Sequence, residues 1–317
     1  MDAMDNILQI RDLAVEFKTD TGLTHALNDV SFDVPRGQVT AIVGESGSGK
    51  SVTAYCIMRL IQPPGKIVNG NIDFTPQSTS AFEIVSLQKN DSRLLELRGG
   101  LISMVFQEPM TALCPVYTVG NQVAEAILCH RKVSKDVAWQ EAAQMLGRVG
   151  IGDIERRMKM YPFEFSGGMR QRVVIAMALV CNPELLICDE PTTALDVTIQ
   201  AEILTLIRDL QRELQNSVLF ITHDLGVVAQ LADHVVVMYQ GRVLEIGTVR
   251  QVLKTPLHPY TKGLLAAIPG LAQRGKALAT ISSVIGDTDI STPHPLVKLA
   301  DGRQVSLSQD QIPGDLI

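Results

Sequence analysis

Apolar residues recur along this chain with two periods, and each period predicts a different kind of element. Apolar positions alternate with polar ones in 8–17 and 27–34, so both segments are expected to be antiparallel strands, with a turn at Thr21 and Gly22 between them. Apolar runs predict further strands at residues 39–43, 67–74, 101–106, 185–188, 218–222, 235–239 and 242–246. The polar stretch 78–92 is expected to be a loop.

Helical spacing of apolar residues appears instead at 51–61, 119–149, 169–180, 199–214 and 225–231. Short apolar strands that alternate with helices predict a parallel α/β core. The helical block from about 110 to 165 is then an insertion into that core. After residue 255 the pattern weakens, with prolines at Pro256, Pro259 and Pro269, so we expect a separate C-terminal extension over 255–317.

Composition and charge narrow the function without assigning it. The 317 residues carry a net charge of −6 and a pI near 5.5, which disfavours a nucleic-acid-binding face. No apolar run approaches the ~18 residues that a membrane span requires, and the acidic N-terminus lacks a signal-peptide pattern. The five cysteines are scattered and form no C-x-x-C, so we expect reduced thiols in a cytosolic protein. Any membrane role must therefore come through a partner.

The segment 44–51 reads GESGSGKS and fits G-x-x-x-x-G-K-[ST], a P-loop whose backbone N–H groups surround phosphates. It lies between an expected strand and an expected helix, which is the context that the motif needs. Its glycines let the N–H groups turn inward, and the helix N-terminus adds roughly half a positive charge. Lys50 is expected to neutralise the β- and γ-phosphates, and the Ser51 hydroxyl to bind Mg²⁺. The candidate nucleotide-binding residues are Gly44, Glu45, Ser46, Gly47, Ser48, Gly49, Lys50, Ser51 and Val52.

Four apolar residues that end in Asp189 and Glu190 form a second nucleotide signature. At the end of a strand, Asp189 is expected to lie beside Mg²⁺, directly or through water, while Glu190 orients and polarises the attacking water. Positioned general-base chemistry accelerates a reaction about 10²–10⁴-fold. Read alone, the pair fits equally well as acidic residues that cap a helix.

A third run, SGGMRQR at 166–172, opens the helix expected at 169–180. A Ser-Gly-Gly at a helix start exposes N–H groups to an anion, which makes a second phosphate site in one chain. The run resembles the signature motif of ABC ATPases, and its candidate residues are Ser166, Gly167, Gly168 and Gln171.

Other motifs of that family follow in the expected order. Gln107 matches the Q-loop, where it is a catalytic and Mg²⁺-binding candidate, Asp196 matches the D-loop, and His223 matches the switch histidine. Phe17 sits where the family places an aromatic ring to stack on adenine. Each has a plainer interpretation: a loop hydrogen bond for Gln107, a structural role for His223, core packing for Phe17, and a helix N-cap for Asp196, which does not exclude the D-loop role.

The resemblance spans about residues 7–270 and implies an α/β fold: a P-loop ABC-type ATPase core with an antiparallel β-subdomain and an inserted helical subdomain at about 110–180. The domains expected are an ATPase domain over 1–254 and the extension over 255–317. In that family two such domains pair head-to-tail, and each ATP lies between the P-loop of one and the signature helix of the other. The γ-phosphate then bridges the two halves until hydrolysis removes it.

A finer resemblance is to the ATP-binding subunits of bacterial dipeptide and oligopeptide importers. It rests on the P-loop, on FQEPM at 106–110, on the signature run and on PLHPYT at 256–261, which opens that subfamily's extension. Many such subunits carry cysteines in the extension, associated with an iron–sulfur cluster. No cysteine follows Cys188 here, so we expect no cluster. Residues 281–317 match no motif of the subfamily.

The resemblance implies ATP and Mg²⁺ as cofactors and ATP hydrolysis that drives import of di- or oligopeptides. It implies a second ABC ATPase subunit, in a homo- or heterodimer, two integral membrane permease subunits and, indirectly, an extracytoplasmic solute-binding protein, but no nucleic acid. The expected location is peripheral, on the cytoplasmic face of a bacterial inner membrane.

Two alternatives stay open: a soluble ABC ATPase outside transport, and an importer ATPase for another cargo such as a sugar, nickel or an opine, because this subunit need never touch its cargo. A P-loop kinase or GTPase is disfavoured, because the signature run has no role there and the chain contains no Asn-Lys-x-Asp guanine reader.

Overall fold

The computed structural model of the protein describes residues 5–20, 22–88, 90–107, 109–193, 195–267, 285, 290 and 292–316. The chain forms two compact units and passes between them several times. Unit 1 comprises Met1–Ile7, Pro35–Gly37 and Phe74–Phe220, and unit 2 comprises Leu8–Val34, Gln38–Asp73 and Ile221–Ile317. The units cut across the boundary expected between residues 254 and 255, which stays a prediction.

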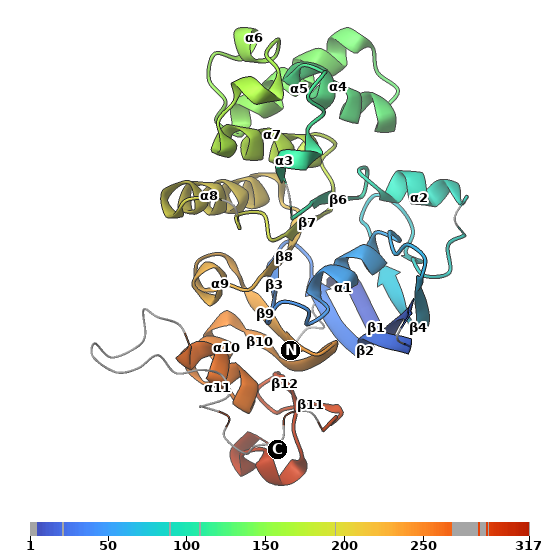
Figure 1. The fold of residues 1–317 in the computed structure, drawn as a ribbon, viewed down its shortest axis with the longest axis vertical. Coiled ribbons are helices and arrows are strands. Elements are labelled where there is room, and N and C mark those ends of the chain that lie inside the picture. The colour runs from blue at the N-terminus through green and yellow to red at the C-terminus, as the bar shows by residue number, and fades with distance from the viewer. Residues whose placement is uncertain are drawn as a thin grey trace. The chain divides into compact units, whose positions relative to one another are not determined.

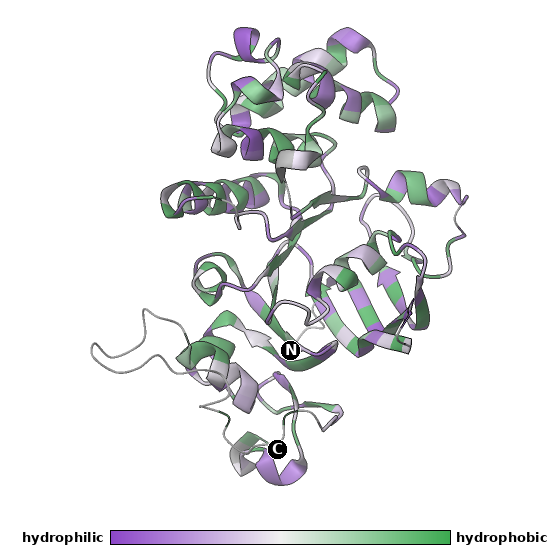
Figure 2. Ribbon diagram, in the orientation of Figure 1, coloured by the Kyte–Doolittle hydropathy of each residue, from purple (hydrophilic) through white to green (hydrophobic). Residues whose placement is uncertain are grey.

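Unit 1 contains a buried pair of parallel strands. Its strands are β5 (Phe82–Glu83), β6 (Ile102–Val105), β7 (Leu185–Asp189) and most of β8 (Ser217–Thr222). β6 runs parallel to β7, with Ile102 opposite Leu185 and Val105 opposite Cys188. Every residue of β6 and β7 is buried, as the uninterrupted apolar runs predicted. The long helix α8 (Val197–Leu214) is amphipathic, with apolar and polar residues on different sides (Figure 2).

Helices make up the rest of unit 1: α2 (Ser92–Leu97), α3 (Pro109–Ala112), α4 (Val119–His130), α5 (Lys135–Arg148), α6 (Ile154–Arg157), η1 (Pro162–Glu164) and α7 (Gly167–Leu179). α4, α5 and α7 pack against one another (Figure 1), which confirms the inserted helical block. The loop expected over 78–92 is wrong in two places, because β5 lies within it and α2 begins at Ser92. Asp91 caps α2 by accepting the Arg93 N–H, and Leu94 is buried.

Unit 2 contains most of a small sheet in which β1 (Asn6–Thr19) lies between β2 (Gly22–Pro35) and β4 (Gly65–Phe74). Buried and less buried residues alternate along much of β1 and β2, as their apolar period predicted. Thr21, in the turn expected between them, lies outside the described residues.

The second sheet of unit 2 has the order β11 (Leu296–Lys298), β12 (Gln304–Ser306), β10 (Arg242–Thr248), β9 (His234–Tyr239) and β3 (Val39–Val43). β3 and β9 are parallel, and the other pairs are antiparallel. Its helices are α1 (Lys50–Ile57), α9 (Leu225–Leu231), α10 (Val249–Lys254), α11 (Pro259–Ala266), η3 (Gln309–Gln311) and η4 (Gly314–Leu316). The extension therefore adds two strands beside β10. Helix α1 is shorter than the expected 51–61, and Arg59, with φ of 54°, has already left helical geometry.

Among the described residues, no helix reaches the length and apolarity needed to cross a membrane. All five cysteines are described and are free thiols, as the sequence predicted. Glu108 of the Q-loop run, Ala194 of the D-loop run, Pro269 and most of 281–291 lie outside the described residues.

Candidate functional site

The P-loop of unit 2 is a tight turn that begins at the end of β3 and leads into α1. Gly44, Gly47 and Gly49 have φ of 153°, 79° and 99°, in the range that favours glycine. At Gly44 a side chain is excluded, because a Cβ there would lie 2.1 Å from the Met238 carbonyl oxygen of β9. The predicted strand–loop–helix order is therefore present, and its first glycine is fixed by close contact with the sheet.

Lys50 lies inside this turn and is only 5% exposed. Its Nζ donates to the carbonyl oxygens of Gly44, at 2.9 Å, and Glu45, at 2.8 Å. The Gly241 N–H donates to the Ser48 carbonyl at 3.0 Å and ties the loop to the β9–β10 turn. A buried ammonium thus lies at the N-terminus of α1, where the helix dipole adds further positive potential.

The rim of the loop is open. Glu45, Ser46 and Gly47 are exposed, and a Cβ built on Gly47 meets no heavy atom within 4 Å. Free space beside backbone N–H groups and a buried cation is the arrangement that binds a phosphate chain.

Two other candidates of unit 2 lie on separate elements. Phe17 of β1 is half-buried, and its ring packs against Gly65, where a Cβ would lie 2.5 Å from Cε1. Packing therefore accounts for its position, and stacking on adenine stays a prediction. His223 is exposed directly after β8, and the neighbouring Asp224 caps α9 by accepting the Gly226 N–H at 2.7 Å.

In unit 1 the structure brings two of the predicted catalytic residues together. Asp189 ends β7 and is fully buried, and Glu190 follows in left-handed conformation with φ of 45°. The Glu190 Oε2 accepts from Gln107 Nε2 at 3.4 Å and from Thr193 Oγ1 at 3.0 Å. A carboxylate held from two sides can orient a water molecule. Thr193 is absent from the sequence prediction, because a threonine two residues past a proline carries no pattern of its own.

The signature run forms the start of α7 in the same unit. Ser166 is the N-cap and accepts the Met169 N–H at 3.3 Å. A Cβ on Gly167 meets no heavy atom within 4 Å, whereas one on Gly168 would lie 2.8 Å from Ile199 Cγ2 in the first turn of α8. Asp196 caps α8 by accepting the N–H groups of Thr198 and Ile199 at 3.1 and 3.0 Å. Signature and D-loop residues are therefore neighbours.

Gln171 lies differently from the rest of its motif. It is fully buried, and neither amide atom has a hydrogen-bond partner. In this conformation its side chain faces the interior of unit 1, so contact with a nucleotide on another subunit stays a prediction that the geometry does not favour. Arg172 instead joins α7 to its surroundings through the Val149 carbonyl and Glu202, both within 3 Å.

We compared the chain with known protein families. Residues 27–193 match the family model described as ABC transporter. The chain belongs to the ABC transporter family. Residues 244–288 match a second model, the oligopeptide/dipeptide transporter C-terminal region, which confirms the resemblance of the extension.

Curated relatives of this ABC transporter chain include two peptide transport proteins. It is 50% identical over 293 residues to the dipeptide transport ATP-binding protein DppD of Bacillus subtilis, covering 92% of this chain and 85% of the relative. It is 49% identical over 277 residues to the oligopeptide transport ATP-binding protein OppD of Escherichia coli, covering 87% and 80%.

Solved structures confirm the predicted fold class. A dimeric structure of the ABC transporter cassette MJ0796 aligns with a TM-score of 0.66 and 26% identity over 77% of this chain and 99% of that one. The cbiO1 protein of Clostridium perfringens aligns with a TM-score of 0.65 and 30% identity, covering 79% of this chain and 92% of that one. A further structure of the MJ0796 cassette is described as a dimer in a post-hydrolysis state with ADP and phosphate.

Proposed function

We propose that this chain binds and hydrolyses ATP to energise an ABC importer for dipeptides, oligopeptides or similar solutes. The observation that carries the proposal is the order of two family matches: the ABC transporter match precedes an extension of oligopeptide/dipeptide transporter type. Identity near 50% to peptide transport ATP-binding proteins over most of the chain supports it.

The P-loop supplies the binding half of the chemistry. Backbone N–H groups around the open rim donate to the phosphate oxygens, and Lys50 neutralises the β- and γ-phosphates. Ser51, Gln107 and Asp189 are the proposed Mg²⁺ ligands, and hydroxyl, amide and carboxylate oxygens are the donors that this ion prefers. When bound there, Mg²⁺ would supply positive charge to the phosphates, while Glu190 accepts a proton from the attacking water.

The exposed N-terminus of α7 is the observation that favours a second ATPase subunit as partner. Ser166, Gly167 and the N–H groups around them are not enclosed by unit 1, and Val197 beside Asp196 is 83% exposed. We propose that this surface meets the nucleotide of another ABC subunit, in a homo- or heterodimer.

A short loop at residues 114–118, after the Q-loop, is the observation that favours membrane partners. The buried Gln122 side chain holds it by donating to the carbonyls of Cys114 and Tyr117 at 2.9 Å and accepting the Cys114 N–H at 2.8 Å. Val116 and Tyr117 are thereby presented outward, 71% and 57% exposed. We propose that this loop docks on one of two permease subunits at the cytoplasmic face of the membrane, with an extracytoplasmic binding protein delivering solute to them.

Affinity purification from membranes tests the proposal. Tagged full-length chain is expected to co-purify with two integral membrane proteins, and Tyr117→Asp is expected to lose them because it places a charge on the docking loop. Leu95→Asp is the matched control, because Leu95 is 73% exposed on α2 outside that loop. If the unaltered chain purifies without membrane proteins, the proposed association with permease subunits is wrong. If Tyr117→Asp retains them, the proposed docking through this loop is wrong.

A further inference from the structure

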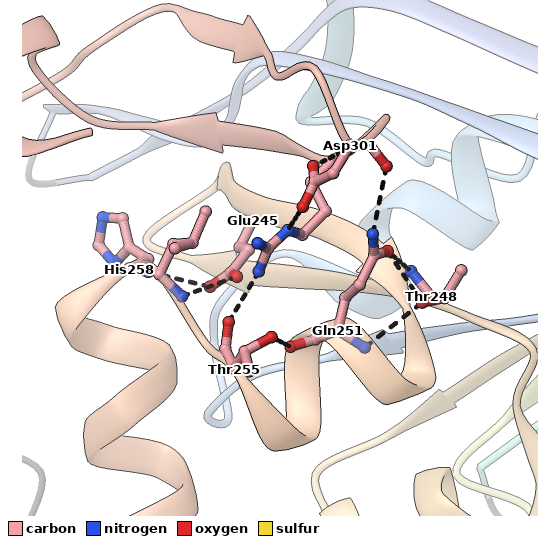
Figure 3. Close-up of polar contacts among 8 residues, drawn as sticks. Glu245, Thr248, Gln251, Thr255, His258 and Asp301 are labelled. Carbon is pink, nitrogen blue, oxygen red and sulfur yellow. Dashed lines mark hydrogen bonds and ion pairs between the residues drawn. The ribbon is translucent and has the colours of Figure 1, made fainter. Parts of the chain in front are cut away.

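The extension is anchored on β10 by a buried carboxylate. Glu245 is fully buried, and its Oε1 and Oε2 accept the N–H groups of Leu257 and His258 at 2.9 and 3.0 Å (Figure 3). Arg303, from the far end of the extension, donates to the Thr255 carbonyl at 2.7 Å. Because these contacts satisfy buried polar groups from three segments, they fix where the turn before α11 leaves the sheet.

That turn sets the direction of Tyr260. His258 caps α11, its Nδ1 accepting the Tyr260 N–H at 3.1 Å. The Tyr260 side chain is 0% exposed and packs in a core cluster with Ala41 and Val43 of β3. Its ring centroid lies 4.6 Å from that of Tyr239, at a tilt of 42°. The ring is therefore aimed along β3 towards the P-loop that follows this strand.

The hydroxyl of Tyr260 contacts the P-loop itself. It accepts the Glu45 N–H at 3.2 Å and lies 3.4 Å from Glu45 Oε2, to which it donates. Burial raises the pKa of Tyr260 well above its ordinary value, so the hydroxyl stays protonated and keeps its donor and acceptor functions. The two partners are 215 residues apart in sequence.

The peptide group that joins Gly44 to Glu45 also holds Lys50. The Gly44 carbonyl accepts from Lys50 Nζ, and the Glu45 N–H, on the opposite edge of the planar trans peptide, donates to Tyr260. Rotation of this peptide would break both bonds together. Gly44 is meanwhile wedged against the Met238 carbonyl, which leaves the peptide little alternative space.

We propose that Tyr260 is a positioning residue for ATP binding: its hydroxyl clamps the Gly44–Glu45 peptide, and this peptide holds Lys50 on the phosphate chain. The C-terminal extension is thus a structural part of the nucleotide-binding loop. A role in packing alone requires only the ring, so the hydroxyl separates the two explanations. The inference rests on the proposed ATP binding.

Replacing Tyr260 by Phe removes the hydroxyl and keeps the ring. ATP affinity of the full chain, measured by calorimetry with Mg²⁺, is expected to fall about three- to tenfold, because the partly buried Glu45 N–H loses its acceptor and the Glu45 carboxylate loses a donor. Tyr239→Phe is the matched control: its hydroxyl accepts from Nε2 of the exposed Gln240 at 3.1 Å, away from the P-loop peptide, so affinity is expected to stay within about twofold.

Unchanged ATP affinity in Tyr260→Phe overturns the inference even if the unfolding temperature falls, because a hydroxyl that only stabilises the fold would lower that temperature without changing ATP affinity. Absence of ATP binding by the unaltered chain contradicts the proposed function instead. Amide hydrogen exchange of the unaltered chain gives a second readout that needs no variant. The Glu45 amide is expected to exchange more slowly than that of the exposed Gly47, and equal rates contradict the clamp.

Discussion

Two helix starts in this molecule carry Ser/Gly-rich runs, and they differ in how much of a binding site each one completes. The start of α1 encloses a cation: Lys50 is buried and held by two carbonyls, and the loop around it contacts Met238 of β9 and Tyr260 of the extension. The start of α7 is supported by its own Ser166, and Gly167 has open space in front of it. On the proposed function, the first binds phosphates with its own residues, whereas the second presents N–H groups to a nucleotide on another subunit.

This difference gives a physical reason for one chain to carry two anion-binding helix starts. A γ-phosphate that binds both the buried and the open start, on different subunits, stabilises their association only while it is present. Moving a two-state equilibrium from 1:99 to 99:1 takes about 5.5 kcal/mol. Charge-assisted contacts to one phosphate group can supply much of that free energy.

The largest effect expected concerns hydrolysis. Glu190→Gln is expected to lower the ATPase rate about 10²–10⁴-fold, because an amide cannot accept the proton of the attacking water. ATP binding is expected to persist, and ATP is expected to trap the dimer. Glu213→Gln is the control, because the Glu213 side chain is 51% exposed on α8 and forms a surface ion pair with Arg148. Hydrolysis by Glu190→Gln near the unaltered rate contradicts the role of Glu190.

The next effect concerns the enclosed helix start. Lys50→Ala is expected to weaken ATP binding about 100-fold or more, because the phosphates lose a buried charge partner. Lys254→Ala, an exposed lysine at the end of α10, is the control and is expected to bind as the unaltered chain does. Calorimetric titration measures the ATP affinity of both variants. Equal affinities would contradict the role of the P-loop in ATP binding.

A smaller effect concerns the stability of the extension, whose residue His258 lies next to the turn that holds Tyr260 against the P-loop. Burial lowers the pKa of His258 to about 4, with further lowering from His294 and Lys262. The unfolded chain, with an ordinary pKa near 6.5, binds this proton more readily, so stability falls as pH decreases from about 6.5 to 4. His258→Asn keeps an N-cap without this titration.

Between pH 7.5 and 5, the unaltered chain is therefore expected to lose on the order of 1–2 kcal/mol more unfolding free energy than His258→Asn. Urea unfolding followed by circular dichroism measures this difference. An equal loss in both proteins would show that His258 is not the titrating group.

The sequence predicted the elements whose stability is decided locally. Strand β3 and helix α9 match their predicted bounds, because an apolar run and an Asp N-cap define them. Motif spacing also placed Gln107, Glu190 and the signature run, since each lies at the end of such an element. Their places on the fold were therefore accessible from the chain alone, and their roles in the site stay predictions.

Features formed by distant segments escaped prediction. β11 and β12 have three residues each, too few to show a period, and pair with each other and β10. The Tyr260 contact with Glu45 and the Glu245 anchor join segments that no local pattern relates. The buried position of Gln171 depends on packing around α7, which its motif does not encode.

The most direct measurement is the ATP affinity of an isolated full chain whose open helix start is blocked. Gly167→Glu places a negative charge where a phosphate from another subunit is expected, and the Cβ has space. Gly147→Glu is the matched control, because that glycine of α5 also has space for a Cβ. We predict affinities within about twofold of the unaltered chain for both, with ATP-driven dimerisation and hydrolysis lost only in Gly167→Glu. A tenfold loss of affinity in Gly167→Glu alone would place this helix start at the nucleotide of its own subunit and contradict the account.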